Sequence, residues 1–224
     1  ALEAILLSAA EDPEVRVAVI CGSPGAFCGG NDMPSFLGMS KENTQDIPPL
    51  RMMRAVRNFP KALIAAINGV TVGVGVTLLP HCDLVYASED SRFILPFVNL
   101  GICPEFASTY VMPQIMGHQK AAELLFFGDP FDAQTARECQ LVTAVMDSDA
   151  VEQHAQAQAA KLAAKAPNAL RTTKLLMRRW QDEKVNEVMS HEIERLLELL
   201  HQGEAKQAIT AFIEKRKPDF SAFK

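Results

Sequence analysis

The sequence predicts an α/β fold in which helices pack outside a parallel sheet. Two short apolar runs, at residues 16–21 (RVAVIC) and 62–67 (ALIAAI), each end at a glycine-bearing turn, and helical patterns follow them. A repeated strand–turn–helix order indicates βαβ units, and strands that are apolar throughout are typical of a sheet covered on both faces. The length of 224 residues suits one large domain or a core with a small appendage.

The N-terminal part begins in a helical pattern, before the strand at 16–21. Four apolar side chains are expected on one face of that helix: Leu2, Ile5, Leu6 and Ala9. After the strand, the glycine-rich residues 22–31 are expected to form a loop, with Asp32 capping a short helix. The polar, proline-broken residues 40–49 are expected to form a surface loop, and 50–58 a helix.

The middle of the chain is predicted to contain a helix followed closely by two strands. The segment 72–80 (VGVGVTLLP) is expected to be a tightly buried helix, and 83–87 and 92–95 to be strands. Pro104 and Glu105 are expected to open another helix, since proline is favoured in a first helical turn.

The C-terminal part, beyond the apolar run at 141–146, is expected to be helical to the end. Residues 149–165 and 185–202 are both amphipathic, and Pro167 separates them from the segment between.

Composition and charge exclude several classes of function. The net charge of −5 argues against broad attraction to nucleic acid, and no apolar run is long enough for a membrane span. The five cysteines and five histidines show neither C-x-x-C pairs nor metal-ligand spacing, so we expect free thiols, a reducing compartment and no metal site.

The chain opens at Ala1 inside the helical pattern, so we expect that its true start is absent and that any targeting signal is not visible. The corresponding expectation for location is the cytoplasm in a bacterium, and a mitochondrion or peroxisome in a eukaryote.

Two glycine-bearing loops share one design: a strand, then small residues, then a helix start. They are Gly29-Gly30-Asn31-Asp32 and Gly73-Val74-Gly75. Free N–H groups at such helix starts, aimed at one point, could hold a developing oxyanion. Alternatively, the glycines only permit turns and close packing. A dinucleotide site is disfavoured because Leu78 replaces the third glycine of that fingerprint.

Glu105 stands among apolar or small neighbours: Ile102, Cys103, Phe106 and Ala107. A carboxylate in such surroundings loses hydration, which raises its pKa toward the range useful for a general base. The alternative is a glutamate whose only role is a favourable interaction with a helix dipole.

The tail at 212–218 (FIEKRKP) has two possible interpretations. Its cations could hold phosphates beside an aromatic ring, or the segment could simply be a solvated helix end.

Three stretches together resemble the crotonase, or enoyl-CoA hydratase/isomerase, superfamily over nearly the whole chain. They are VAVICGSPGAFCGGND, KALIAAINGVTVGVGVTLLPHCDLVYASEDSRFILPFVNLGICPE and AFIEKRKPDF, and their order and spacing are strongly specific. The resemblance implies a spiral of ββα units at residues 1–160, without the first strands of the family, and a C-terminal helical trimerisation region at 161–224. It also implies a homotrimer, or a hexamer built as a dimer of trimers.

The resemblance also assigns roles to particular positions. It places the oxyanion hole at the backbone N–H groups of Asn31 and Val74, with Glu105 as the catalytic acid or base. The remaining implied positions are Met33, Thr77 and Phe97 in the substrate pocket, and Ala26, Cys28, Phe212 and Lys215 at CoA. Pro34 stands where a phosphate-binding lysine is often found, which puts one usual CoA contact in doubt.

The same resemblance favours one reaction over another. Hydratases of the family commonly carry two glutamates at the positions of Thr77 and Phe97, whereas isomerases carry one glutamate where LGICPE places Glu105. The expected activity is therefore that of a Δ3,Δ2-enoyl-CoA isomerase, with CoA arriving on the substrate and no other cofactor. The alternatives are another crotonase-type reaction, such as an atypical hydratase, and a non-catalytic acyl-CoA-binding protein.

Overall fold

The computed structural model describes residues 1–23, 25–32 and 47–223. The strands are β1 (Val17–Cys21), β2 (Ala26–Cys28), β3 (Ala62–Ile67), β4 (Val70–Val72), β5 (Leu84–Ser88), β6 (Arg92–Ile94), β7 (Phe131–Asp132) and β8 (Ala144–Met146). The α-helices are α1 (Leu2–Glu11), α3 (Pro48–Arg57), α4 (Val74–Thr77), α5 (Ser108–Met116), α6 (His118–Phe127), α7 (Ala133–Glu138), α8 (Val151–Ala163), α9 (Pro167–Leu200) and α10 (Gly203–Ile213). The 3₁₀ turns within these described ranges are η2 (Leu79–His81) and η3 (Val98–Leu100).

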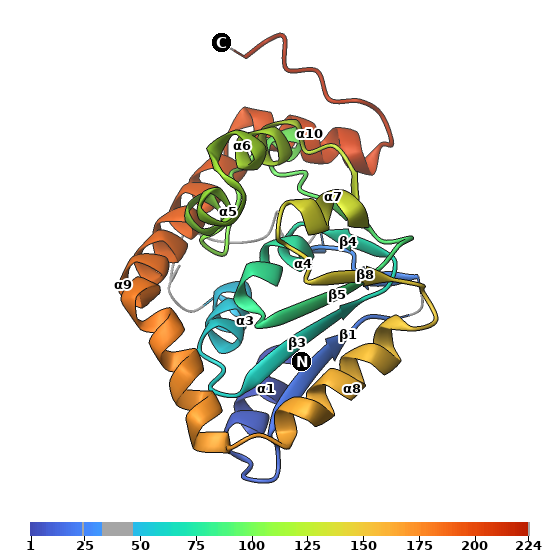
Figure 1. Ribbon diagram of the computed structural model, residues 1–224. Helices are drawn as coiled ribbons and strands as arrows, with labels where there is room; N and C mark the ends of the chain where they lie inside the picture. Colours follow the sequence, from blue (N-terminus) through green and yellow to red (C-terminus); the bar gives the residue numbers. More distant parts are fainter. Residues whose placement is uncertain (24, 33–46, 224) are drawn as a thin grey trace.

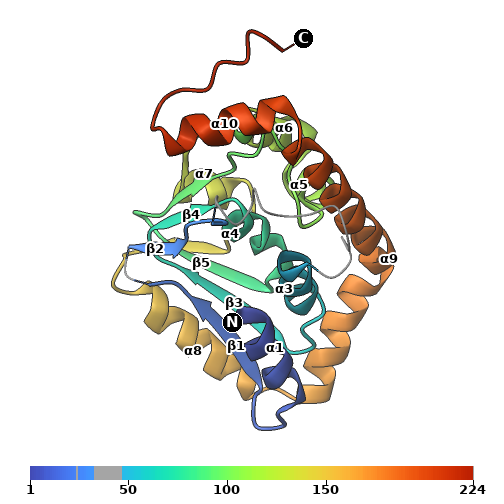
Figure 2. The ribbon, with the colours of Figure 1, turned by 180° about the vertical axis from the view of Figure 1, so that it is seen from behind.

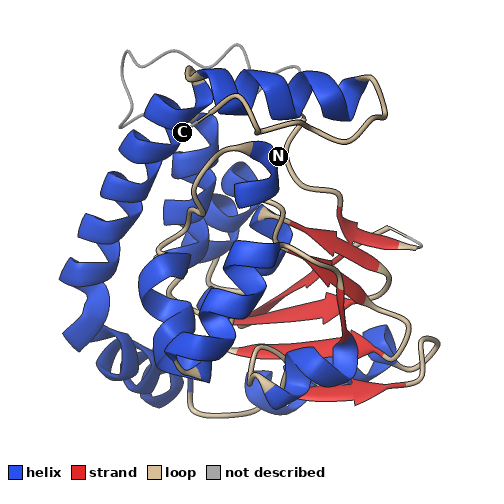
Figure 3. Cartoon of the chain, turned by 90° about the horizontal axis from the view of Figure 1, so that it is seen from above, coloured by secondary structure: helices blue, strands red, loops and turns tan. Residues whose placement is uncertain are grey.

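The strands form two sheets between which the chain alternates. The first sheet has the order β1-β3-β5-β8 and is parallel throughout. The second has the order β2-β4-β6-β7, with β7 antiparallel to β6. Figure 3 shows the strands gathered on one side of the molecule with helices around them. The predicted α/β class with a parallel sheet is confirmed.

The central strand β3 is buried on both faces, as its apolar run predicts. Leu63, Ala65 and Ile67 belong to the main core, whereas Ile64 and Ala66 pack in a second cluster with residues of α8. Figures 1 and 2 show α8 alongside β1 and β3, and the long helix α9 on the side of α3 and α5. The predicted division near residue 160 falls inside α8, and the assignment of two domains stays a prediction.

The helix α9 is tied to the sheet by buried and half-buried charges near its start. Lys174 donates to the carbonyl of Lys61 and to Asp83 Oδ2, each at 2.7 Å. Arg178 donates to Asp83 Oδ1 at 2.9 Å and to the carbonyl of His81 at 2.6 Å. On the opposite side of this part of α9, large apolar side chains face outward, and Trp180 is 83 % exposed. None of the described helices combines the length and apolar character needed to cross a bilayer.

Two predicted helices differ from the structure around the central loops. Residues 72–80 form the end of β4, the short helix α4 and the turn η2 rather than one helix. Glu105 does not open a helix, because Phe106 and Ala107 have φ of 62° and 57° and delay the start of α5 to Ser108. Left-handed backbone cannot continue a right-handed helix, so Glu105 lies in a turn.

Other differences lie at the termini and in the first loop. Ile5 is 64 % exposed, because α1 packs mainly on α3 and buries only Leu6 fully. Pro48 begins α3 instead of ending a loop, and Pro167 begins α9; proline suits both places because the first helical N–H groups need no partner. The chain is not helical to its end, since α10 stops at Ile213. The cap expected from Asp32 and most of the loop expected at 40–49 concern residues 33–46, outside the described residues.

Gly75→Ala is expected to destabilise the fold. A Cβ at this position would lie 2.6 Å from Cys28 Cβ and 3.1 Å from Thr71 Cγ2, so α4 would have to move away from β2 and β4. Overpacking of this kind costs about 1–3 kcal/mol of unfolding free energy, measurable by urea denaturation. Gly29→Ala is the matched control, because a Cβ at Gly29 has no neighbour within 4 Å among the described residues. Equal unfolding free energies for the two variants would contradict this packing constraint.

Candidate active site

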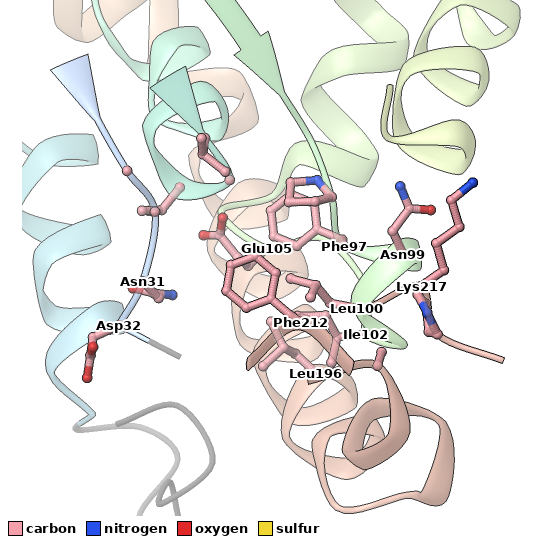
Figure 4. A pocket seen from close by; sticks show the side chains of 18 of the residues that line it. Asn31, Asp32, Phe97, Asn99, Leu100, Ile102, Glu105, Leu196, Phe212 and Lys217 are labelled. Carbon is pink, nitrogen blue, oxygen red and sulfur yellow. The ribbon is translucent and has the colours of Figure 1, made fainter. Parts of the chain in front are cut away.

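A cavity of about 740 Å³ lies where the second sheet meets α9 and α10. Its lining comes from the segments that follow β2, β4 and β6, and from the C-terminal tail; the described lining residues include Asn31, Val74, Phe97, Glu105 and Phe212. Figure 4 shows Glu105 near the middle, with Asn31 and Asp32 to one side and Asn99 and Lys217 to the other. The carboxyl ends of neighbouring parallel strands are a usual place for a ligand.

Two backbone amides at this edge are available for a ligand. β2 and β4 pair in parallel, so the loops that follow them leave the sheet side by side. Gly75 packs against Cys28 and keeps α4 close to the end of β2. Neither the N–H of Asn31 nor that of Val74 donates to an acceptor among the described residues. Both residues line the cavity, so the predicted pair of N–H donors is brought to one site.

Glu105 is a buried carboxyl group on the cavity wall, with 2 % of its surface exposed. Its Oε1 accepts a hydrogen bond from Thr77 Oγ1 at 2.6 Å, while Oε2 has no partner among the described residues. Burial raises the pKa of Glu105 to about 8; the Thr77 hydrogen bond lowers it, and the carboxylate of Glu192 raises it. The Thr77 hydrogen bond therefore fixes Oε1, and Oε2 is available for proton transfer.

The turn that carries Glu105 is held from two other elements. Glu192 on α9 accepts the N–H of Ala107 at 2.6 Å and that of Thr109 at 2.9 Å. Burial lowers the pKa of His81 to about 3, so its ring is neutral. Its Nε2 therefore donates to the carbonyl of Phe106 at 2.7 Å, and the two rings stack at 4.1 Å. These contacts offset the strain of the left-handed backbone, which is about 1–2 kcal/mol per residue.

Sequence reasoning missed Glu192, and little in the sequence signals its role. It stands in an ordinary amphipathic helix that also contains Glu194 and Glu198, and only the fold brings it to the turn. The apolar spacing of Val185, Met189, Ile193 and Leu196 could have placed it next to a buried face.

Several residues assigned by resemblance lie away from the described cavity wall. Thr77 is fully buried behind Glu105 and reaches it by the hydrogen bond rather than lining the cavity. Ala26 and Cys28 are half-buried in β2, and Lys215 is exposed in the turn after α10; none of the three is among the described lining residues. Met33 lies outside the described residues.

The C-terminal tail contributes two other cations to the cavity. Arg216 and Lys217 line it together with Phe212 and Phe220. Lys215 adopts a φ of 55° at the end of α10, and this turn brings the next two residues to the wall. Cations beside aromatic rings suit a phosphate-bearing nucleotide. Among the described residues, no group of three or more His, Cys, Asp or Glu is placed to hold a metal ion.

Comparison with known proteins finds a family that matches nearly the whole chain. The family model for enoyl-CoA hydratase/isomerase matches residues 2–222. The "Probable enoyl-CoA hydratase" of Bacillus subtilis is 34 % identical over 213 residues, which are 93 % of this chain and 83 % of that protein. The "Enoyl-CoA delta isomerase 2" of Rattus norvegicus is 34 % identical over 219 residues, 96 % of this chain but 56 % of the rat protein.

Solved structures show the same similarity in three dimensions. Pseudomonas aeruginosa OdaA superposes with a TM-score of 0.91 and 39 % identity, over 95 % of this chain and 86 % of that one. An enoyl-CoA hydratase/isomerase from Pseudoalteromonas atlantica T6c also gives 0.91, with 33 % identity over 98 % and 87 % of the two chains. Because the family model spans nearly every residue and the fold agrees, the chain belongs to the enoyl-CoA hydratase/isomerase family, the crotonase superfamily of enzymes that act on acyl-CoA thioesters.

Proposed function

We propose that the chain is a Δ3,Δ2-enoyl-CoA isomerase that uses Glu105 as its single acid–base group. The observation that supports this most directly is the state of that carboxyl group: it is buried in the cavity wall, its pKa is raised to about 8, and none of the described residues pairs with its Oε2. A base whose pKa lies near the working pH is suited to both taking and returning a proton. Asp32, the other described acid of the lining, is exposed.

The reaction needs one proton transfer in each direction. Glu105 Oε2 takes a proton from C2 of the 3-enoyl thioester, and the C–H electron pair forms a dienolate whose negative charge falls on the thioester oxygen. The N–H groups of Asn31 and Val74 stabilise that oxygen, and one such donor is worth about 3–4 kcal/mol in other enzymes. The carboxyl group then returns the proton to C4, which leaves the double bond between C2 and C3.

The positions beside Glu105 favour isomerisation over hydration. Water addition requires a group that activates water and a group that protonates carbon. Phe97 is apolar, and Thr77 is committed to Glu105, so neither supplies a second acid–base group. Hydration remains the second candidate because a relative from Bacillus subtilis and another from Escherichia coli carry hydratase names.

The remaining features of the proposal concern the rest of the substrate and the assembly. The CoA nucleotide lies toward the tail, where Phe212, Arg216 and Lys217 line the cavity. No resident cofactor takes part, since CoA arrives with the acyl group. The active form is a homotrimer, or a hexamer made of two trimers.

Glu105→Gln is expected to abolish isomerisation while leaving the fold intact. The amide fills the same volume but cannot accept the C2 proton, so kcat should fall about 10²–10⁴-fold. The assay follows the absorbance of the conjugated thioester when 3-enoyl-CoA is added. Water addition to 2-enoyl-CoA, measured in parallel, should be slow for both proteins. Wild-type hydration much faster than isomerisation would favour the hydratase, and unchanged isomerisation in Glu105→Gln would remove Glu105 from the reaction.

The pH dependence of wild-type kcat/KM should report the ionisation of Glu105. The reacting form is the carboxylate, and its pKa is raised to about 8. Activity is therefore expected to increase as the pH rises through about 8 and to level off above it. A profile already flat from pH 6 upward would mean that the reacting group has an ordinary carboxyl pKa, contrary to the burial of Glu105.

Thr77→Val should move this profile to higher pH. The Thr77 hydrogen bond lowers the pKa of Glu105, so its loss should raise that pKa further and reduce kcat/KM at pH 7. Activity should recover at high pH, because the carboxylate itself is retained. A uniform loss across the pH range, with an unmoved midpoint, would assign Thr77 a different role.

A further inference from the structure

Glu192 is a buried carboxylate that the proposed reaction does not use. It is 5 % exposed, lies on α9, and is not among the described residues that line the cavity. Burial raises the pKa of Glu192 to about 7, while its hydrogen bonds from Thr109 and Ala107 lower it. A buried carboxylate is costly unless donors surround it, so its presence here requires an explanation.

The hydrogen bonds of the Glu192 carboxylate go to the start of α5. Oε2 accepts the N–H of Ala107 at 2.6 Å; Oε1 accepts the N–H and the hydroxyl of Thr109, at 2.9 Å and 2.5 Å. Ala107 is the N-cap residue of α5 and has no side chain that could cap it. Glu192 therefore provides, from a different helix, the cap that α5 lacks, and its negative charge suits a helix N-terminus.

This cap acts on the residues that follow Glu105 directly. Phe106 and Ala107 both have the left-handed φ that residues other than glycine rarely adopt. The Glu192 bond to the Ala107 N–H and the His81 bond to the Phe106 carbonyl hold that turn from opposite sides. If the Glu192 contacts were lost, the backbone could relax toward more favourable angles, and the side chain of Glu105 would turn with it.

We propose that Glu192 is a positioning residue, which caps α5 from α9 and so holds Glu105 at the cavity wall. The position of Glu192 is itself set by α9, which Lys174 and Arg178 fix to the sheet near its other end. This inference rests on the proposed function, in which Glu105 is the acid–base group. The Glu192 carboxylate raises the pKa of two neighbouring groups, Glu105 and the thiol of Cys103, although burial is the larger cause in both.

The test compares Glu192→Ala and Glu192→Gln with Glu194→Gln, an exposed glutamate of the same helix. In both Glu192 variants, kcat for 3-enoyl-CoA should fall about 10- to 100-fold, because small misplacement of a catalytic group has that effect. KM should change less than about twofold, because Glu192 does not touch the cavity. Glu194→Gln should match wild type.

A second readout does not depend on activity. The pKa of Glu105 is measured by ¹³C NMR of labelled glutamate carboxyls, with the signal assigned by its loss in Glu105→Gln. In the Glu192 variants this pKa should fall below about 8, because a nearby negative charge is removed and the carboxyl gains water. If wild type fails to isomerise 3-enoyl-CoA, the proposed function fails, whereas this titration still tests whether Glu192 sets the surroundings of the Glu105 carboxyl group.

Rescue separates positioning from a general loss of stability. Glycine adopts a left-handed φ without strain, so adding Ala107→Gly to Glu192→Ala should restore much of the lost kcat, relative to Ala107→Gly alone. If Glu192→Ala does not fold, Glu192→Gln, which keeps one acceptor oxygen, carries the same comparison. Unchanged kcat and unchanged Glu105 pKa in the folded Glu192 variants, or a kcat loss that Ala107→Gly does not reduce, would overturn the inference.

Discussion

The chemistry of this protein depends on keeping one carboxyl group out of water. Glu105 is buried, one of its oxygens accepts a hydrogen bond from Thr77, and the other has no partner in the part of the chain that the structure describes. Such a group would normally turn toward solvent, since burial penalises its charged form. The Thr77 hydrogen bond holds its side chain, and contacts from His81 and Glu192 hold the backbone turn that follows it. Contacts made by neighbouring residues therefore offset the free-energy cost of burying the Glu105 carboxyl group.

The fold brings the other half of the site to the same place by simple geometry. Parallel strands all leave a sheet at the same edge, so the loops after β2 and β4 emerge as neighbours. A glycine at position 75 lets α4 pack closely on β2, and the amides of Asn31 and Val74 then lie on one cavity wall, where no described residue accepts their N–H groups. A backbone N–H group is present whatever the side chain. The small residues around Asn31 and Val74 therefore indicate the position of the two donors better than the identities of Asn31 and Val74 do.

Much of the fold and part of the site could be predicted from sequence because their signals are local. The apolar run of β3 and the glycine-bearing loops each predict their structure from a few consecutive residues. Glu105 stands out as the acidic residue among apolar neighbours. The left-handed turn after Glu105 could not be predicted, because Phe106 and Ala107 do not favour it and distant contacts impose it. Arg216 and Lys217 line the cavity and Lys215 does not, because of how the turn after α10 is oriented. The sequence alone does not indicate that orientation.

The outward-facing apolar side chains near the start of α9 include Trp180, which is the only tryptophan of the chain. Its indole is 83 % exposed and lies on the far side of the helix from the buried charges that anchor it. The protein therefore contains a natural fluorophore whose emission should respond to whatever covers that surface and hardly at all to the contents of the cavity. Quenching by a dissolved anion or acrylamide would measure, without any added label, how much of the indole is open to solvent.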